Sequence, residues 1–336
     1  MTTNLATGLG SMPGEDFAES VQIVLGEVGA FPHVPELPAR GATAAMTGRT
    51  LALVTELGVD LQPAGWRLTD ASGLDHRRAA SLLAQDLDAV EELSSGQQGP
   101  FKVQVAGPWT LAATVERPRG DKALADHGAR RDLAQALAQG VQDHVGDVRR
   151  RTGGDKIFVQ IDEPALPAVL SGAVPTASGF GRHRTVTPAD AAAALGWVVA
   201  AAISVDAVPV VHCCAEGLPW AVLRETDVRA LSFDLSTIGR AEYDDVAAWV
   251  ESGRQVWTGV VPVGEPDRWP TDADLTRQLL TWWAHLGYSD VETLPPTTVT
   301  PACGLAGASP RWARRALQLA TTVAQNLSVE QGKIDA

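Results

Sequence analysis

The chain has 336 residues, with 27 Lys and Arg against 40 Asp and Glu, so its formal net charge is −13. This acidic balance argues against a nucleic-acid partner and against docking on an anionic membrane, because both depend on clustered basic residues. No apolar run approaches the ~20 residues that a membrane span needs, and the first nine residues do not form a secretory signal. Three cysteines are too few for a disulfide framework in a chain of this length, so we expect a cytoplasmic protein.

Short β-branched runs alternate with longer stretches of helical spacing along most of the chain. The predicted strands are, in chain order, 6–12, 102–106, 155–162, 209–214, 230–235, 255–263 and 297–303. The predicted helices are 16–28, 74–93, 133–148, 189–205, 243–250, 275–286 and 311–327. An eighth strand is expected near 31–37 or 61–68. This repeated alternation predicts an α/β fold, a (β/α)₈ TIM barrel that forms a single catalytic domain over 1–336.

The most irregular segment is 164–184, which contains three prolines and several glycines and serines. It follows a predicted strand, so it would lie at the rim formed by the carboxyl ends of the barrel strands. Long structureless segments in compact domains usually serve as lids or binding loops, but a poorly ordered surface insertion explains the composition equally well.

Potential metal ligands lie at the ends of three predicted strands. His212 and Cys214 share one face of their strand, since side chains alternate, whereas Cys213 points to the other face. One imidazole and one thiolate suit tetrahedral zinc, and Cys303 reaches the same rim from the last strand. Asp234 ends the strand between them and is the candidate fourth ligand. The alternative is that the cysteines are small buried hydrophobic residues, which free cysteines often are.

Other strand ends are candidates for a substrate pocket. Asp162 and Glu163 end an apolar strand and suit an amino group, although a helix N-cap or a rim salt bridge explains them too. The glycine-rich turn around Ser11 offers backbone amides that could hold a carboxylate. Within 31–37, His33 and Glu36 are rim candidates, but a lone histidine is more often structural.

Taken together, these residues resemble the C-terminal catalytic domain of cobalamin-independent methionine synthase over nearly the whole chain. The motifs that carry the resemblance are Gly10-Ser11-Met12-Pro13, Gly107-Pro108-Trp109-Thr110, Ile161-Asp162-Glu163-Pro164, His212-Cys213-Cys214 and Cys303-Gly304-Leu305. That family is a (β/α)₈ barrel whose zinc, held by His, two Cys and Glu, activates homocysteine for methyl transfer.

The resemblance implies that His212, Cys214 and Cys303 bind zinc. It implies that Asp162 and the Ser11 segment bind homocysteine, with Glu36 sharing the amino-group role. We therefore expect a zinc-dependent methyltransferase that makes methionine from homocysteine, with methyl-folate or a methylated corrinoid as donor. The alternatives are a zinc-dependent alkyltransferase acting on another thiol, and a non-catalytic module that stores zinc or docks a corrinoid protein.

Three departures from the family pattern qualify the resemblance. Asp234 stands where the family has Glu, one methylene longer. Pro262-Val263-Gly264 replaces an Asp-x-His whose histidine would help to protonate a folate leaving group. The chain is also about half the length of the two-barrel enzymes, like a short core form. We therefore expect a methylated corrinoid to be a better donor than methyl-folate.

Overall fold

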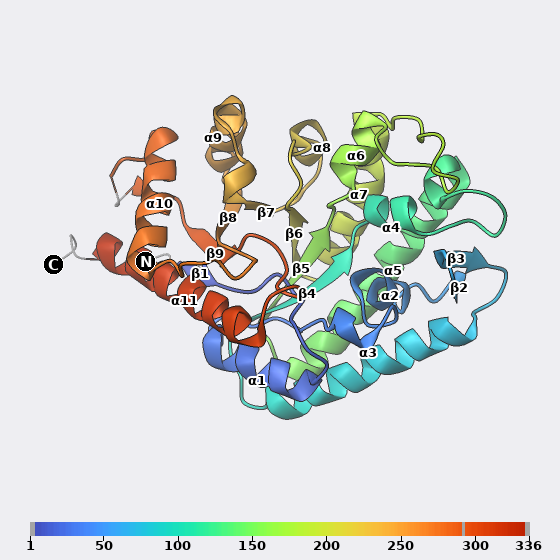
Figure 1. Cartoon of the computed structure of the whole chain (residues 1–336), viewed down its shortest axis with the longest axis horizontal. Coiled ribbons are helices and arrows are strands. Elements are labelled where there is room, and N and C mark those ends of the chain that lie inside the picture. Colours follow the sequence, from blue (N-terminus) through green and yellow to red (C-terminus); the bar gives the residue numbers. More distant parts are fainter. Residues whose placement is uncertain (1–3, 291–292, 333–336) are drawn as a thin grey trace.

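The computed structural model describes residues 4–290 and 293–332, and its centre is a curled sheet of seven parallel strands in a TIM-barrel-like α/β arrangement (Figure 1). The spatial order is β1-β9-β8-β7-β6-β5-β4. The strands are β1 Leu5–Ala6, β4 Pro100–Ala106, β5 Lys156–Asp162, β6 Ala207–Cys213, β7 Ala230–Asp234, β8 Gln255–Val261 and β9 Thr297–Pro301. Each corresponds to one of the seven predicted strands.

Helices surround this sheet, with α6, α8 and α9 on one side of the view and α1, α3 and α11 on the opposite side (Figure 1). The helices are α1 Phe17–Glu27, α2 Met46–Leu51, α3 Leu74–Leu93, α4 Pro108–Thr114, α5 His127–Thr152, α6 Leu166–Ser171, α7 Pro188–Ser204, α8 Trp220–Arg224, α9 Tyr243–Glu251, α10 Asp272–His285 and α11 Pro310–Gly332. The seven predicted helices are all present. The additional ones, α2, α4, α6 and α8, are too short for apolar periodicity to predict.

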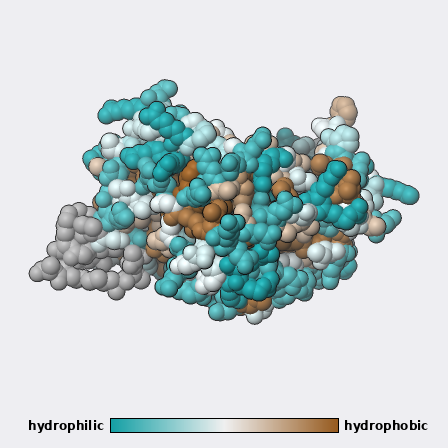
Figure 2. Space-filling model, turned by 90° about the horizontal axis from the view of Figure 1, so that it is seen from below, coloured by the Kyte–Doolittle hydropathy of each residue, from teal (hydrophilic) through white to brown (hydrophobic). Residues whose placement is uncertain are grey.

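Local sequence signals explain where several helices begin. Thr187 and Thr271 accept hydrogen bonds from backbone amides of the first turns of α7 and α10, and so satisfy groups that have no partner within the helix. The long helices are amphipathic, and the face of the molecule in Figure 2 is mostly hydrophilic, with hydrophobic side chains in separate patches. No helix in the described part of the chain is both long and apolar enough to cross a membrane.

The segment around Val34 lies between the two ends of the curled sheet. Val34 N–H donates to the carbonyl of Lys102 in β4 at 3.0 Å, and Glu36 N–H donates to the carbonyl of Gly10, just after β1, also at 3.0 Å. Isolated parallel bridges join His33 to Lys102 and Ser11 to Glu36. This segment therefore hydrogen-bonds both edges, as an eighth strand would, without regular strand geometry.

The other location proposed for an eighth strand, 61–68, was wrong. These residues belong to an antiparallel hairpin, β2 Gly58–Gln62 and β3 Gly65–Thr69, which forms a separate two-stranded sheet. Gly65 has a φ of 127°, which only glycine adopts readily, so the tight turn brings the chain back on itself.

Two further segments differ from expectation. Only Leu5–Ala6 of the first predicted strand forms a regular strand beside β9, and from Gly10 to Met12 the chain hydrogen-bonds Glu36 instead. Gly8 lies closely packed against another side chain. A Cβ on Gly8 would lie 2.3 Å from His33 Cε1. The irregular segment 164–184 contains the helix α6 and an antiparallel bridge between Pro175 and Arg182, so it is not structureless.

The two faces of the strands have different contents. One face packs into the main apolar cluster, to which β5 contributes Val159 and Ile161. The other face begins at the amino end of the strands with a small separate apolar cluster, formed by Phe31, Val210, Ala230 and Trp257 with Leu5 and Phe158 packed against it. Alternate residues share a face, so the positions that follow on this second face include Gln160, Asp162 and His212.

Candidate functional site

Three side chains from two strand ends meet at the carboxyl edge of the sheet. His212 is the penultimate residue of β6, Cys214 follows that strand, and Cys303 follows β9. Their ligand atoms all lie within 4.8 Å of one another. Cys303 Sγ is 2.7 Å from Cys214 Sγ and 3.8 Å from His212 Nε2. Parallel strands make this convergence, because their carboxyl ends share one edge.

This donor set fits zinc. Tetrahedral zinc with Zn–S near 2.3 Å and Zn–N near 2.0–2.1 Å holds its sulfur and nitrogen ligands about 3.6 Å apart and two sulfurs about 3.8 Å apart. The distance of 3.8 Å between Cys303 Sγ and His212 Nε2 already matches this geometry. The two sulfurs would separate by about 1 Å on binding, and both cysteines are only partly buried beyond the strand ends. Three donors leave one tetrahedral position for a further ligand.

The two thiols share a proton unequally. The hydrogen bond from Cys214 lowers the pKa of Cys303 to about 4, against the effect of burial and with further help from His212. The same hydrogen bond and burial raise the pKa of Cys214. The hydrogen bond between the two sulfurs therefore favours the ionised form of Cys303 and the neutral form of Cys214. Cys213 lies in the apolar core outside this group, and burial raises its pKa to about 12.

Asp234 is not part of the group of three. It ends β7, and its Oδ1 accepts hydrogen bonds from Ser236 N at 2.8 Å and Ser236 Oγ at 2.7 Å, which cap the short 3₁₀ helix Leu235–Thr237. Asp234 shares a strand face with Ser232, which is paired with His212 in the β6–β7 register. To reach the group, the Asp234 side chain would have to give up this cap, at a typical cost of ~1 kcal/mol.

Ser232 is a site residue that the sequence reasoning missed. Its Oγ lies 3.0 Å from His212 Nδ1, so the second ring nitrogen, Nε2, faces the sulfurs. Metal-binding histidines commonly have such a partner, which fixes the ring orientation and the tautomer. The alternation of side chains could have identified Ser232, because it lies two residues before Asp234 and so shares its strand face, beside the strand that carries His212.

The two acids at the end of β5 have different surroundings. Asp162 lies opposite His212 in the β5–β6 register, and its Oδ1 accepts a hydrogen bond from Gln160 Nε2 at 2.7 Å. Glu163 instead accepts from the amides of Trp109 and Thr110 at 2.9 and 2.8 Å, at the start of α4. Burial raises the pKa of both carboxyls to about 7. Glu163 thus has the capping role, and Asp162 is the acid beside the three donors.

Ser11 lies against the loop that carries Cys303. Its carbonyl accepts a hydrogen bond from Leu305 N at 2.8 Å, and a Cβ on Gly304 would lie only 2.0 Å from Ser11 Oγ. Ser11 is also bridged to Glu36. The predicted carboxylate-binding segment therefore contacts the two residues that follow Cys303, a predicted metal ligand.

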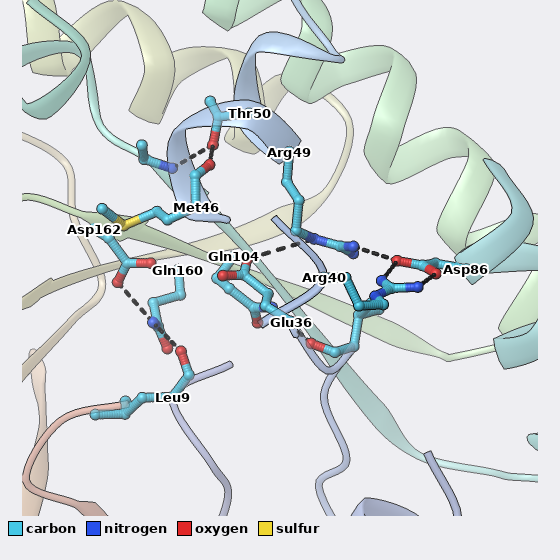
Figure 3. A network of polar contacts seen from close by, with 12 residues as sticks. Leu9, Glu36, Arg40, Met46, Arg49, Thr50, Asp86, Gln104, Gln160 and Asp162 are labelled. Atoms are coloured by element: carbon cyan, nitrogen blue, oxygen red, sulfur yellow. Dashed lines mark hydrogen bonds and ion pairs between the residues drawn. The ribbon is translucent and has the colours of Figure 1, made fainter. Parts of the chain in front are cut away.

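Glu36 is buried and already has a cationic partner. Arg49 Nε lies 3.8 Å from Glu36 Oε1, and Arg49 also forms an ion pair with Asp86, which Arg40 binds through both carboxylate oxygens (Figure 3). Burial raises the pKa of Glu36, and the charge of Arg49 opposes this shift. Arg49 and Asp86 were not predicted, since they lie on helices far apart in sequence.

A buried lysine lies below Asp162 on the same face of the neighbouring strand. Lys102 is fully buried, and its Nζ donates to Gln104 Oε1 at 3.0 Å and Gln160 Oε1 at 2.8 Å. None of these three residues was predicted. Buried parallel strands usually read as continuous apolar runs, so polar residues at alternate positions of β4 and β5 were the signal that could have found them.

Comparison with known proteins identifies a family and a solved structure that is similar over its full length. A model of the family described as "Cobalamin-independent synthase, Catalytic domain" matches residues 90–326, well over half of the chain. Among solved structures, a B12-independent methionine synthase from Shewanella sp. W3-18-1, in complex with selenomethionine, is similar with a TM-score of 0.63 and 13% identity, covering 98% of this chain and 99% of that one. At this identity, the similarity shows the fold alone.

Weaker structural similarities extend to glycosidases. A β-galactosidase from the psychrophilic Marinomonas ef1 has 12% identity and a TM-score of 0.47, covering 98% of this chain and 60% of that one. A GH5_18 protein from Streptomyces cattleya, in complex with GlcNAc, has 16% identity and a TM-score of 0.47, covering 98% and 81%. These similarities are too low to inform the chemistry of this chain. No curated protein matched it at a significant level.

Proposed function

The chain belongs to the cobalamin-independent methionine synthase family, and on that basis we propose that it transfers a methyl group to the thiol of homocysteine to give methionine. Methyl transfer is the activity of the family. The observation that carries the proposal for this chain is the meeting of His212, Cys214 and Cys303 within 4.8 Å beside a buried carboxylate, Asp162.

We propose zinc as the cofactor, held by His212, Cys214 and Cys303. Bound zinc would stabilise the substrate sulfur as a thiolate at neutral pH, since a coordinated thiol loses its proton. The hydrogen bond from Cys214 and the nearby His212 lower the pKa of Cys303, which favours the thiolate form that binds zinc. Asp234 remains the candidate fourth ligand before substrate binds, once its side chain leaves Ser236. The substrate thiol would then replace it.

The amino acid part of the substrate would lie between Asp162 and the Ser11 segment. Asp162 Oδ1 is held by Gln160, which leaves Oδ2 for the substrate ammonium. Ser11 contacts the Cys303 loop and suits the carboxylate. Glu36 is paired with Arg49 and contributes charge to the same pocket. A buried acid favours a thiol that carries an amino group over a simple alkyl thiol, which supports homocysteine over the alternative thiol substrates.

We propose a methylated corrinoid, rather than methyl-folate, as the better donor. Pro262-Val263-Gly264 carries no titratable side chain to protonate a folate nitrogen. The nearest following acid, Glu265, accepts hydrogen bonds from Ser309 Oγ at 2.6 Å and Trp269 Nε1 at 3.2 Å, which hold its carboxylate at the start of α11. General acid catalysis contributes roughly 10²–10⁴-fold, so its loss weighs against a folate donor.

Three expectations about the whole chain belong to this proposal. The segment around Val34 would close the curled sheet into an eight-stranded barrel, since it hydrogen-bonds both edges. Residues 1–336 would form a single catalytic domain, with 164–184 at the rim beside the site. A reducing cytoplasm would keep the free cysteines available for metal.

The decisive experiment supplies the zinc-loaded protein with homocysteine and a panel of methyl donors and measures methionine. We expect methionine formation that is faster with methylcobalamin than with methyl-folate at equal concentration. Asp162→Asn should weaken homocysteine binding by about 1.5–3 kcal/mol, as expected for a charged hydrogen bond, in a calorimetric titration. Absence of methionine with every donor would contradict the proposed activity, and faster turnover of methyl-folate would contradict the donor argument.

A further inference from the structure

Lys102 is a buried cation that the proposed chemistry does not use. It lies within β4, is fully buried, and directs its ammonium at two side-chain amides, Gln104 Oε1 at 3.0 Å and Gln160 Oε1 at 2.8 Å. Lysine is almost never fully buried unless its charge is satisfied. A hydrophobic residue would fill this strand position at lower cost, so the charge itself calls for an explanation.

The ammonium decides how both amides are oriented. Lysine has only donors, so Gln104 and Gln160 each turn their oxygen toward it and their NH₂ group away. Gln160 Nε2 then donates to Asp162 Oδ1 at 2.7 Å and to Leu9 O at 2.9 Å, as Figure 3 displays. A flipped Gln160 would place its NH₂ against the ammonium and its oxygen against the carboxylate, so both contacts would become repulsive.

We propose that Lys102 is a positioning residue of the amino-acid subsite, which acts through Gln160 to fix the Asp162 carboxylate that binds the substrate amino group. This inference rests on the proposed function, which assigns that role to Asp162. Gln160 lies between Lys102 and Asp162, so Lys102 itself would not contact the substrate. The selectivity for an amino-bearing thiol would therefore depend on a residue outside the pocket wall.

The charges around Lys102 are consistent with this role. Burial lowers the pKa of Lys102 to about 7, and the charges of Asp162 and Glu36 raise it. Lys102 in turn favours the ionised form of both acids. One buried cation thus stabilises the ionised forms of two buried acids, and their charges stabilise its ammonium in return.

The test compares two thiols that differ only in the amino group, homocysteine and 4-mercaptobutanoate. The zinc-loaded wild type should bind homocysteine at least about tenfold more tightly, the lower end for a charged hydrogen bond. Lys102→Met should lose most of this preference through weaker homocysteine binding, with zinc content and 4-mercaptobutanoate affinity unchanged. Lys156→Met is the matched control, because it removes the same charge from an exposed position on the adjacent strand and should keep the preference.

A second substitution distinguishes positioning from a general structural role. Gln160→Met removes the connecting amide, so it should abolish the preference, and Lys102→Met should add no further loss in the double variant. If Lys102→Met does not fold, Gln160→Met with unchanged zinc content still tests the connection, and a retained preference would overturn it. A folded Lys102→Met that still prefers homocysteine overturns the positioning role alone. A wild type with no preference overturns the proposed amino-group site as well.

Discussion

The proposed metal site gives a prediction in which adjacent cysteines should behave differently. Cys213 and Cys214 are consecutive, yet only Cys214 belongs to the group with His212 and Cys303. Zinc binding to a four-ligand protein site amounts to about 10–16 kcal/mol at pH 7, or about 3 kcal/mol per ligand when shared equally. Cys214→Ala and Cys303→Ala should therefore each weaken zinc binding by about 100-fold. Cys213→Ala should leave the affinity unchanged, since its side chain lies in the apolar core.

Competition with a chromophoric chelator at pH 7 measures these affinities, and elemental analysis gives the zinc content of the purified proteins. Substitution with cobalt adds an independent measurement, because the sulfur-to-metal absorption should fall by about half when one of two thiolates is lost. Asp234→Asn should have the smallest effect of the ligand variants, since that carboxylate caps the following turn. Equal loss of zinc in Cys213→Ala and Cys214→Ala would refute the assignment of the ligands from strand geometry.

Three further predictions concern the surroundings of the site and the scaffold. Ser232→Ala should weaken zinc binding by about 10–100-fold, since it removes the hydrogen-bond partner of His212. Gly304→Ala should destabilise the protein by about 1–3 kcal/mol through the contact with Ser11 Oγ, and adding Ser11→Gly should restore most of the loss in urea unfolding. The pKa of His144 is lowered from 6.5 to about 4 by burial and by Arg49. The contribution of neutral His144 to the free energy of unfolding is therefore full above pH 6.5 and is lost as the pH falls to 4. Between pH 7 and 5, the free energy of unfolding of His144→Phe should fall by about 2 kcal/mol less than that of the wild type.

Matched variants make these outcomes specific. Ser236→Ala removes a hydroxyl that faces Asp234 instead of His212, so it should not reduce zinc affinity as Ser232→Ala does. His127 is exposed at the start of α5, so His127→Phe should leave the acid sensitivity of the fold unchanged. An identical loss of stability between pH 7 and 5 in the wild type and His144→Phe would contradict the pKa argument.

Strand positions and the convergence of His212, Cys214 and Cys303 follow from the sequence, because both depend on strand periodicity and on the parallel arrangement of the strands. The alternation of side chains along β6 is enough to separate Cys213 from His212 and Cys214, and the parallel arrangement brings Cys303 to the same edge. Asp234 also ends its strand on the face that carries Ser232, as alternation predicts. Its side chain nevertheless accepts hydrogen bonds from Ser236, because the backbone amide of that residue lies only two residues away in the chain. Side-chain rotamers at strand ends depend on such short-range competition, which sequence periodicity does not describe.

The pocket polar network is harder to predict because its members pair across large sequence separations. Arg49 binds Asp86 and approaches Glu36, and these three residues come from two helices and an irregular segment. No spacing rule connects them. The edge segment around Val34 was only one of two possible locations for the eighth strand, because Pro32 and Pro35 interrupt its strand pattern. Its hydrogen bonds nevertheless reach Gly10 and Lys102.

The inner face of the strands nevertheless follows a rule that connects fold and function. At the amino end this face is aromatic, with Phe31 packed 4.7 Å from Phe158 and 5.4 Å from Trp257, measured between ring centroids. Above this floor the same face becomes polar at Lys102 and Gln160, and at the carboxyl ends it carries the candidate ligands. An apolar floor excludes water from beneath the charged layer, where low polarity strengthens each electrostatic contact. On the proposed assignments, Lys102 and Gln160, which would position other groups, lie midway along their strands, and the groups that would contact the substrate or the metal lie at the carboxyl ends.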